Sequence, residues 1–530
     1  MFYLKLAETE QQVIQHFNNF KIGGVGLATQ NDEVIYHHYK DWSQEYLTFE
    51  MLENGSIYWK TTMEYTSHTI SYSKDNGTTW SSITSNVSGV EIPALAGDKV
   101  LFKGDNDWYG PDNELYSYFS ASTNINVYGN IMSLCYGDNF ATATTLKSGY
   151  TFCSLFYGCP IVNAKNLVLP ATTLADNCYN SMFAGCKSLT TAPVLPATTL
   201  TNGCYQYMFA YCTSLTNAPE LPATTLTQSC YYGMFYGCTS LATAPELPAT
   251  TLTDGCYNQM FRGCTSLTTA PELPATTLTQ SCYAWMFQDC TALATAPELP
   301  ARTLAVSGYS SMFDGCTSLT TAPALPATTL ANHCYRQMFE GCTSLTTAPD
   351  LPATTLSGYC YFRMFSGCTS LVTGPSKIQA SRMQNASCQE MFKDCTSLTT
   401  APALPTTKLY LNCYLGMFAG CTSLTSAPTL PAKTLASACY QSMFASCTSL
   451  TSAPELPAIT LVQGCYQYMF RGCTNLNYIK CLATNISANG TLDWVNGVSA
   501  TGTFVKPAST DWSSKTGTNG IPNGWTVQDA

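Results

Sequence analysis

The chain has 530 residues and a formal net charge of −10 at pH 7, with only 23 lysines and arginines. So few cations argue against a nucleic-acid partner, which proteins bind largely through its phosphates. Charged residues make up 11% of the chain, less than half of the roughly 25% that is typical of a globular protein. Hydrophobic residues make up 45%, which is enough to bury a large core and excludes a disordered chain.

Residues 1–130 are predicted to form an all-β attachment domain. The first residues, MFYLKLAETEQQVIQHF, lack the basic and apolar regions of a Sec signal peptide. Residues 8–20 favour a short amphipathic helix, and aromatic and β-branched runs broken by Asn-Gly turns predict strands from about Val34 onward. No apolar run of the chain approaches 18 residues, so we expect no membrane insertion.

Residues 73–80 read Ser-Lys-Asp-Asn-Gly-Thr-Thr-Trp, which matches the Asp-box pattern S-x-D-x-G-x-T-W. In sialidase-like propellers this motif forms the tip of a hairpin and recurs from blade to blade. The motif occurs once here, so we expect a hairpin in a small β-sandwich, with a glycosidase blade as a distant alternative.

An internal repeat dominates the rest of the chain. Phenylalanine recurs every 26 residues, with two intervals of 27, and marks 13 units between about Thr151 and Cys473. Such a period is typical of stacked repeats, in which each unit buries its apolar face against its neighbours. The phenylalanines lie at positions 156, 183, 209, 235, 261, 287, 313, 339, 365, 392, 418, 444 and 470.

Each unit has two halves, which together predict an α/β solenoid. The half Leu-x-x-Ala-Pro-x-Leu-Pro is extended, because its two prolines exclude a helix. In the other half, Cys-Tyr-x-x-Met-Phe-x-x-Cys, residues such as Cys256, Met260 and Cys264 stand at i, i+4 and i+8 and predict a short helix. We therefore expect 13 turns, each with a short strand and a short helix.

The repeated string F-x-G-C-T-S-L-T-x-A-P-x-L-P resembles the BspA-like class of leucine-rich repeats. Phe261, Gly263, Cys264, Leu267 and Pro274 carry the resemblance in one unit, and about three extra residues precede the aromatic segment. Proteins of that class are surface adhesins of gut and oral bacteria, and similar repeats occur in their phages. The resemblance implies a leucine-rich-repeat fold and binding rather than catalysis.

Cysteine is frequent, with 27 residues, most of them at two fixed positions of the repeat. Buried thiols that pack as small apolar residues are the favoured interpretation, and disulfides between some turns are the alternative. The lack of Cys-x-x-Cys and the presence of only 5 histidines argue against zinc. We predict structural ladders, in which a residue packs on the equivalent residue of the next unit. The ladder residues are Cys186, Cys212, Cys238, Cys264, Phe183, Phe209, Phe235 and Phe261.

The x positions of Tyr-x-x-Met-Phe-x, within the segment Cys-Tyr-x-x-Met-Phe-x-x-Cys, vary freely from unit to unit. Free variation suggests that they escape the stacking constraint and are exposed. Aromatic and arginine side chains on a rigid surface are typical of recognition sites, although drift on a tolerant face would produce the same pattern. The candidate binding residues are Tyr207, Tyr232, Tyr236, Trp285, Arg336, Phe362, Arg363 and Tyr468.

Two acidic features have less specific interpretations. Glu220, Glu246, Glu272 and Glu298 occupy one position in four consecutive units and predict a solvated stripe, with a cation-bridged stripe as the alternative. Residues 105–107 and 112–114 contain acidic pairs, and a polar loop is favoured there over a Ca²⁺ site. The chain presents no catalytic constellation, so we expect no enzymatic activity, no bound metal and no cofactor.

The sequence as a whole predicts a non-enzymatic binding protein with an attachment domain at 1–130, a capped solenoid at 131–475 and a C-terminal cap at 476–530. We expect a phage virion fibre or appendage, exposed on the virion surface and released by lysis, because the N-terminus lacks a signal and 27 thiols suit assembly in a reducing cytoplasm. The expected partners are other virion proteins, through the N-terminal domain, and a host surface protein or glycan; a homotrimer is a candidate assembly. A BspA-like adhesin on a bacterial cell surface is the alternative.

Overall fold

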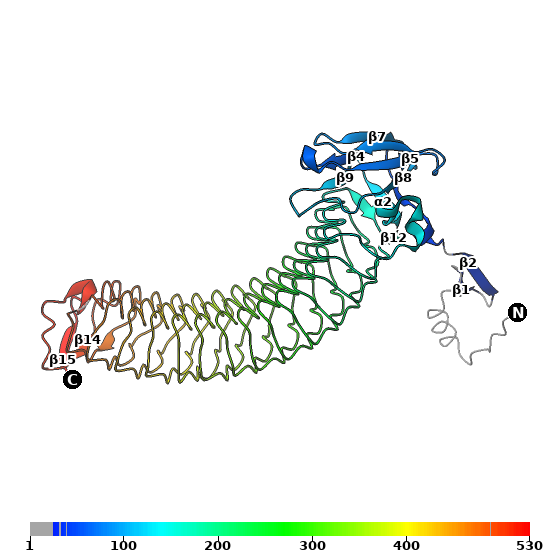
Figure 1. The fold of residues 1–530 in the computed structure, drawn as a ribbon. Helices are drawn as coiled ribbons and strands as arrows, with labels where there is room; N and C mark the ends of the chain where they lie inside the picture. The colour runs from blue at the N-terminus through cyan, green and yellow to red at the C-terminus, as the bar shows by residue number, and fades with distance from the viewer. Residues whose placement is uncertain (1–24, 31–32, 39, 488) are drawn as a thin grey trace.

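The computed structural model describes residues 25–30, 33–38, 40–487 and 489–530. The amphipathic helix predicted over residues 8–20 lies outside these residues. Figure 1 shows an N-terminal β domain, a long curved stack of repeats and a small C-terminal cap in succession. No helix in the described residues is long and apolar enough to cross a membrane.

Two antiparallel sheets pack face to face in the N-terminal β domain. Rings from one sheet, Phe49 and Phe102, meet Phe119 of the other sheet with centroid distances of 4.8 Å each. The space between the sheets is thus filled by aromatic side chains, as in a β-sandwich. One sheet contains β3 (Leu47–Met51), β5 (Thr69–Ser73), β6 (Ser81–Thr84), β8 (Lys99–Gly104) and β10 (Ile125–Asn130); the other contains β4 (Gly55–Thr61), β7 (Val90–Ala94) and β9 (Ser117–Ala121).

The hairpin predicted at the Asp-box motif is present, because β5 and β6 pair antiparallel with residues 74–80 as their connection. Asp75 Oδ1 accepts hydrogen bonds from the Thr79 backbone N–H at 2.9 Å and from Ser73 Oγ at 2.8 Å. A separate antiparallel hairpin precedes the sandwich and consists of β1 (Val25–Gln30) and β2 (Glu33–His38).

The sandwich continues directly into the repeats. Strand β10 pairs in parallel with β11 (Ile161–Asn163) and β12 (Leu167–Val168) of the first repeat. The ring of Phe119 lies 6.0 Å from that of Phe156, which in turn lies 5.2 Å from Phe183. One hydrophobic core therefore extends from the sandwich through the stack.

The prediction of a short helix in every turn is wrong. Apart from α2 (Ser133–Tyr136), which precedes the first repeat, the described residues contain no α-helix. The segment 256–264 instead takes a left-handed backbone conformation at every fourth residue, with φ of 56° at Gln259 and 73° at Gly263. A left-handed residue ends a right-handed helix, so consecutive turns form in its place.

Hydrogen bonds between repeats explain this geometry. The N–H of Met260 bonds within its own turn, to the Tyr257 carbonyl at 3.2 Å, whereas the next N–H, of Phe261, bonds to the Met286 carbonyl of the following repeat at 3.0 Å. An α-helix would direct both N–H groups to carbonyls four residues earlier. The apolar spacing i, i+4, i+8 thus reflects a four-residue turn period, which resembles the 3.6-residue period of a helix.

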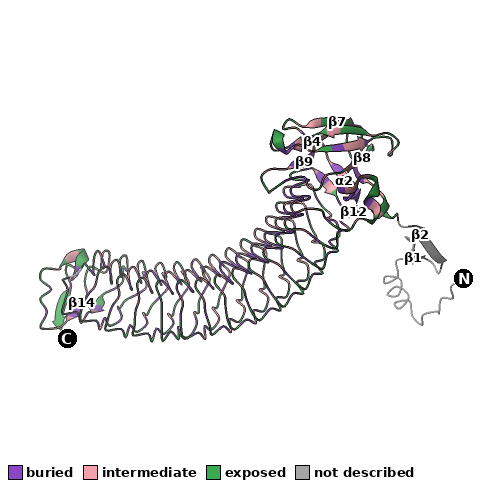
Figure 2. Cartoon of the chain, in the orientation of Figure 1, coloured by how far each residue is buried: buried purple, intermediate pink, exposed green. Residues whose placement is uncertain are grey.

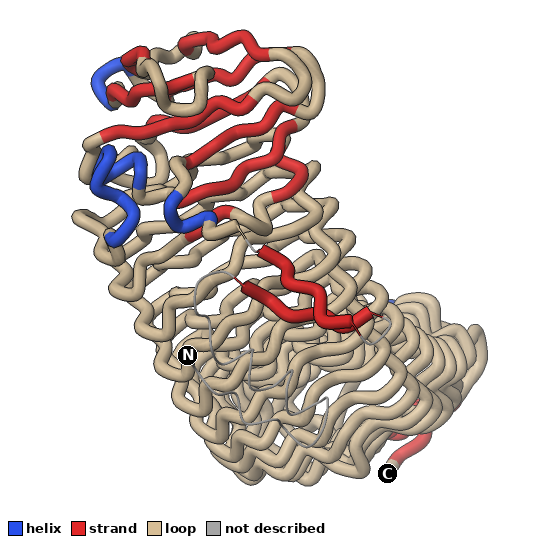
Figure 3. The backbone as a smooth tube through the Cα atoms, turned by 90° about the vertical axis from the view of Figure 1, so that its right-hand side faces the viewer, coloured by secondary structure: helices blue, strands red, loops and turns tan. Residues whose placement is uncertain are grey.

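The extended half of each repeat is also less regular than predicted. Between β12 and β13 (Tyr478–Lys480) all residues are described, and the strand pairing between neighbouring extended halves is reduced to isolated parallel bridges, such as Thr243 to Thr269. Most extended halves contain two prolines, which lack the N–H donors that a continuous ladder of strand hydrogen bonds would need. Figure 3 shows the stack as loops, with strands confined to its ends. The predicted α/β solenoid class is therefore wrong, and the repeats consist of turns and bridges.

Two aromatic ladders hold the repeats in register. Phe235 and Phe261 stack with centroids 5.7 Å apart, and Tyr231 and Tyr257 with centroids 5.9 Å apart. The phenylalanine ladder passes through all 13 repeats, whereas Cys388 takes the tyrosine position in the repeat that follows the second 27-residue interval. Figure 2 shows the buried residues along the interior of the stack.

A three-stranded parallel sheet ends the stack, and its strands lie within the C-terminal cap predicted at 476–530. Strand β14 (Thr503–Lys506) lies between β13 and β15 (Thr526–Asp529). The rings of Trp494 and Trp512 stack with centroids 6.3 Å apart and continue the aromatic core into the cap. The described 3-10 helices are Trp42–Gln44, Glu64–Thr66, Gly137–Thr142 and Gly517–Asn519.

Candidate functional site

The variable positions of successive repeats form one surface, which we call the turn face. It consists of the four x positions of each Cys-Tyr-x-x-Met-Phe-x-x-Cys segment over residues 180–472. In the segment 256–264 the Cys, Tyr, Met and Phe side chains are buried, whereas Gln259 and Arg262 are partly exposed. The fixed residues therefore build the core, and the x positions determine what the surface presents.

The predicted ladder residues lie beneath this face. Cys264 is fully buried, and its thiol donates a hydrogen bond to the Phe235 carbonyl of the preceding repeat at 3.1 Å. The same carbonyl accepts the Cys238 N–H at 3.1 Å. All 27 cysteines lie in the described residues, buried and unpaired. Burial and this bond between repeats give the cysteine a structural role that neither alanine nor a disulfide would fill.

The eight candidate binding residues all lie on the turn face, but they are half-buried rather than exposed. Tyr207, Trp285, Arg363 and Tyr468 occupy the second x position and take left-handed conformations, with φ between 51° and 56°. The candidates pack on residues of neighbouring repeats, which covers part of each side chain. The structure gathers six of them into two clusters; Trp285 lies along the stack between these clusters, and Tyr468 lies near the C-terminal end.

A tyrosine cluster joins three of the candidates with a fourth residue, Tyr211. The ring centroids of Tyr207 and Tyr232 lie 5.2 Å apart, and those of Tyr211 and Tyr236 lie 5.0 Å apart. Burial, together with the neighbouring Tyr232 hydroxyl, raises the pKa of Tyr207, so this phenol stays protonated at neutral pH. The cluster thus presents aromatic surface together with phenolic hydroxyl groups.

Residues of the next repeat border the tyrosine cluster. Gln259 Nε2 donates a hydrogen bond to the Tyr232 hydroxyl at 2.7 Å, and the Arg262 guanidinium lies 5.4 Å from the Tyr236 ring centroid. A cation at this distance over an aromatic ring is attracted by the ring quadrupole. These contacts hold the tyrosine rings in place before any ligand arrives.

An arginine cluster joins the other three candidates with two carboxylates. The guanidinium groups of Arg336 and Arg363 lie 5.3 Å and 5.5 Å from the ring centroid of Phe362. Arg363 also forms ion pairs, with Nε 2.6 Å from Glu390 Oε2 and one terminal nitrogen 3.5 Å from Glu340 Oε1. Arg336 has no such ion pair, and its buried Nε has no hydrogen-bond partner within the described residues. The Arg336 guanidinium is thus more available than that of Arg363 to bind a ligand.

An acidic group lies between the two clusters along the stack. Burial raises the pKa of Asp314 to about 7, with a further contribution from the charges of Glu340 and Asp289. Gln288 Nε2 donates a hydrogen bond to Asp314 Oδ2 at 2.8 Å. The pKa brings the titration of this carboxyl into the physiological range.

Sequence reasoning missed several members of these clusters. Tyr211 is 52% exposed, yet it was not selected because it occupies the fourth x position, which is usually glycine. Glu340, Glu390 and Asp314 also occupy x positions. The x positions of three or four successive repeats, read side by side, would have brought these residues together.

The acidic features outside the turn face have simpler explanations. Glu220, Glu246, Glu272 and Glu298 are exposed, as a solvated stripe requires. Lys147 Nζ lies 3.4 Å from Asp105 Oδ1 and 3.1 Å from Asp107 Oδ1, so a lysine bridges that pair. Within the described residues, no group of three or more His, Cys, Asp or Glu side chains is arranged to hold a metal ion.

The stacked repeats, with their leucine, phenylalanine and cysteine ladders, define a leucine-rich-repeat protein. The chain belongs to the BspA-type leucine-rich-repeat family: the model of the BspA type leucine rich repeat region matches in 6 copies over residues 153–268, 233–372 and 387–490. This repeat type is a non-enzymatic, protein-interaction type and suggests a role in surface adhesion or protein binding. A search among curated proteins found no match.

Proposed function

We propose that this protein is a non-enzymatic adhesin that binds a surface protein or glycan through the turn face. The observation that carries the proposal is the gathering of six candidate residues into two aromatic and arginine-rich clusters. Tyrosine, tryptophan and arginine are the residues that most often dominate binding energy at interfaces. The remainder of the stack serves to hold these side chains in place.

The backbone beneath the clusters is suited to binding because it is already ordered. The Tyr207 N–H bonds to the Tyr232 carbonyl of the next repeat at 2.8 Å, and the Gln337 N–H bonds to the Phe362 carbonyl at 2.8 Å. A preorganised surface loses little conformational entropy when it binds, so more of the contact energy contributes to affinity.

The finer proposal is a phage virion fibre or appendage, with adhesion of a bacterial cell as the alternative setting. In this arrangement the N-terminal sandwich attaches to other virion proteins and the repeat stack projects outward. Two observations support it: the sandwich lies at one end of an elongated molecule (Figure 1), and all 27 thiols are buried and unpaired, as assembly in a reducing cytoplasm allows. A homotrimer would suit a fibre.

Binding of the labelled full-length protein to a panel of bacterial and epithelial cells, measured by flow cytometry, tests the adhesive function. Tyr236→Ala and Arg336→Ala should each lower the bound fraction at least fivefold on the cells that bind the wild type, since tyrosine and arginine anchors at interfaces are worth about 1–2 kcal/mol. Gln441→Ala, on the turn face but outside both clusters, is the matched control. The proposal would be contradicted if Tyr236→Ala and Arg336→Ala bound the cells as well as the control Gln441→Ala.

Mass spectrometry of purified phage particles tests the virion setting separately. Detection of this chain in particles, together with labelling by an antibody against the repeats, would support the fibre. Absence from particles and presence on intact bacterial cells would favour the bacterial adhesin.

A further inference from the structure

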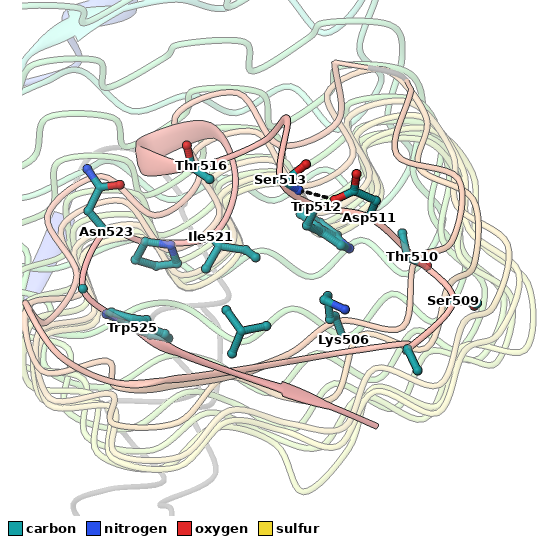
Figure 4. A pocket seen from close by; sticks show the side chains of 14 residues that line it. Lys506, Ser509, Thr510, Asp511, Trp512, Ser513, Thr516, Ile521, Asn523 and Trp525 are labelled. Atoms are coloured by element: carbon teal, nitrogen blue, oxygen red, sulfur yellow. Dashed lines mark hydrogen bonds between the residues drawn. The ribbon is translucent and has the colours of Figure 1, made fainter.

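A pocket lies in the C-terminal cap, outside the turn face. It is a cavity of about 680 Å³, which falls in the range of small-molecule sites. Figure 4 shows it bordered by the loop that carries Thr510 and Trp512 on one side and by Ile521 and Trp525 on the other. The chain that follows β14 and the chain that leads into β15 form its walls, so it is built on the terminal sheet of the stack.

Two polar groups at this pocket are buried without a hydrogen-bond partner. Trp512 is 1% exposed and Thr510 is 6% exposed, and neither Trp512 Nε1 nor Thr510 Oγ1 has a partner within the described residues. The other tryptophans of the cap differ: Trp494 Nε1 donates to the Gly520 carbonyl at 2.9 Å, and Trp525 Nε1 donates to the Ser499 carbonyl at 2.8 Å. An unpaired buried polar group destabilises the fold, so two at one cavity point to an outside partner.

The direction of these groups agrees with this interpretation. In Figure 4 the indole nitrogen of Trp512 lies on the side of the ring that faces Thr510 and Lys506. A ligand in the cavity could accept a hydrogen bond from the indole and exchange one with the hydroxyl. The apolar surface comes mainly from Ile521 and Val527, because the indoles of Trp512 and Trp525 are buried.

The charges at the pocket argue against an ionic ligand. Lys506 Nζ is already paired with Asp529 Oδ1 at 2.9 Å, which leaves its charge largely compensated. Asp511 contributes a carboxylate to the lining, and its Oδ1 accepts the Ser513 N–H at 2.8 Å. An anion would meet the Asp511 charge, and an alkyl chain would leave the Trp512 and Thr510 groups unpaired.

We propose that this cap pocket binds a neutral pyranose unit of a carbohydrate. A sugar ring offers hydroxyl groups that both donate and accept, and C–H groups that pack on apolar side chains, which matches the indole N–H, the threonine hydroxyl, the Asp511 carboxylate and the side chains of Ile521 and Val527. The pocket lies at the opposite end of the stack from the sandwich (Figure 1). This site goes beyond the turn-face adhesion proposed above and does not depend on it.

The test uses the full chain and a panel of neutral methyl glycopyranosides, with binding detected by saturation-transfer NMR. At least one glycoside should bind, and Thr510→Val, which removes the hydroxyl and keeps the side-chain shape, should weaken it about five- to tenfold. Trp512→Phe, which removes the indole N–H, should have a similar effect. Tyr236→Ala, on the turn face, should leave glycoside binding unchanged, so failure of one proposal can be told from failure of the other.

A stability measurement separates a ligand-binding threonine from a structural one. Thr491, also buried in the cap, donates its hydroxyl to the Asn519 carbonyl at 2.8 Å and is the matched control. Thr491→Val should lower the urea midpoint, whereas Thr510→Val should not. Absence of binding by every neutral glycoside would overturn the proposal. Preferential binding of an acidic sugar, a fatty acid or a peptide, or equal destabilisation by the two valine variants without loss of glycoside binding, would overturn it as well.

Discussion

The ring of Tyr207 lies against the backbone of Gly233 in the following repeat, in the space that a side chain at residue 233 would occupy. Gly233 has φ of 57°, so its position also requires the left-handed conformation that glycine adopts without strain. The large side chain of one repeat is therefore accommodated by the absence of a side chain at a glycine in the next repeat. The tyrosine cluster depends on this pairing between repeats.

Gly233→Ala should disturb the tyrosine cluster through a steric overlap with Tyr207. We expect a loss of about 1–3 kcal/mol of stability, from backbone strain plus the overlap, and an altered near-UV circular dichroism of the tyrosines. Gly416→Ala is the control, because Gly416 has φ of 60° but a methyl group there would meet only the flexible Glu390 side chain, at 3.1 Å. Equal effects of the two substitutions would show that the tyrosine contact is unimportant.

The cysteines of the folded protein should be inert to thiol reagents. Burial raises the pKa of Cys238 to about 12, so the reactive thiolate is scarce at pH 8, and the side chain is fully buried. Ellman's reagent should find almost no reactive thiol in the native protein and all 27 in the urea-unfolded chain. Rapid reaction of several thiols under native conditions would contradict the buried ladder.

Asp314 should make the stability of the stack depend on pH. Its folded pKa of about 7 lies above the ordinary value of 3.8, so the folded state holds the proton more tightly than the unfolded chain. The resulting stabilisation is fully present below pH 3.8 and is lost as the pH rises through about 7. Asp314→Asn, which keeps an acceptor for Gln288, should raise stability at pH 8 by about 1–2 kcal/mol once solvent screening is allowed for.

Urea unfolding of Asp314→Asn and the wild type at pH 5 and pH 8 checks this expectation. The gain from the substitution should be larger at pH 8 than at pH 5. Glu246→Gln, in the exposed acidic stripe, should show no comparable difference between the two pH values. A gain that is the same at both pH values would mean that the Asp314 carboxyl does not titrate in this range.

Asp75 should order the hairpin tip of the sandwich. The Thr79 hydroxyl and N–H, with Ser73 Oγ, lower the pKa of Asp75 to about 2. The stabilisation from the ionised carboxylate is therefore present above the ordinary pKa of 3.8 and is lost as the pH falls through about 2. Asp75→Ala should increase hydrogen exchange at residues 77–79 while exchange in the repeat stack stays unchanged. Unaltered exchange at the tip would count against this role.

The candidate site was predictable in its residue types but not in its grouping. Variation at the x positions indicated Tyr207, Arg336 and Phe362 as surface residues. The clusters arise because each side chain packs on a neighbouring repeat. The residues in contact are 23 to 29 positions apart in the sequence, as for Arg363 with Glu340 and Tyr207 with Tyr236. Exposure was overestimated for the same reason.

The 26-residue period, the stacking of like residues and the burial of the cysteines could be predicted from the amino-acid sequence, because the repeats share the same apolar positions. That Cys-Tyr-x-x-Met-Phe-x-x-Cys forms turns rather than a helix became visible only in the folded molecule. The apolar spacing suits both forms, and the choice depends on hydrogen bonds such as that from the Phe261 N–H to the Met286 carbonyl. That partner lies in another repeat, so no single repeat contains the information that excludes the helix.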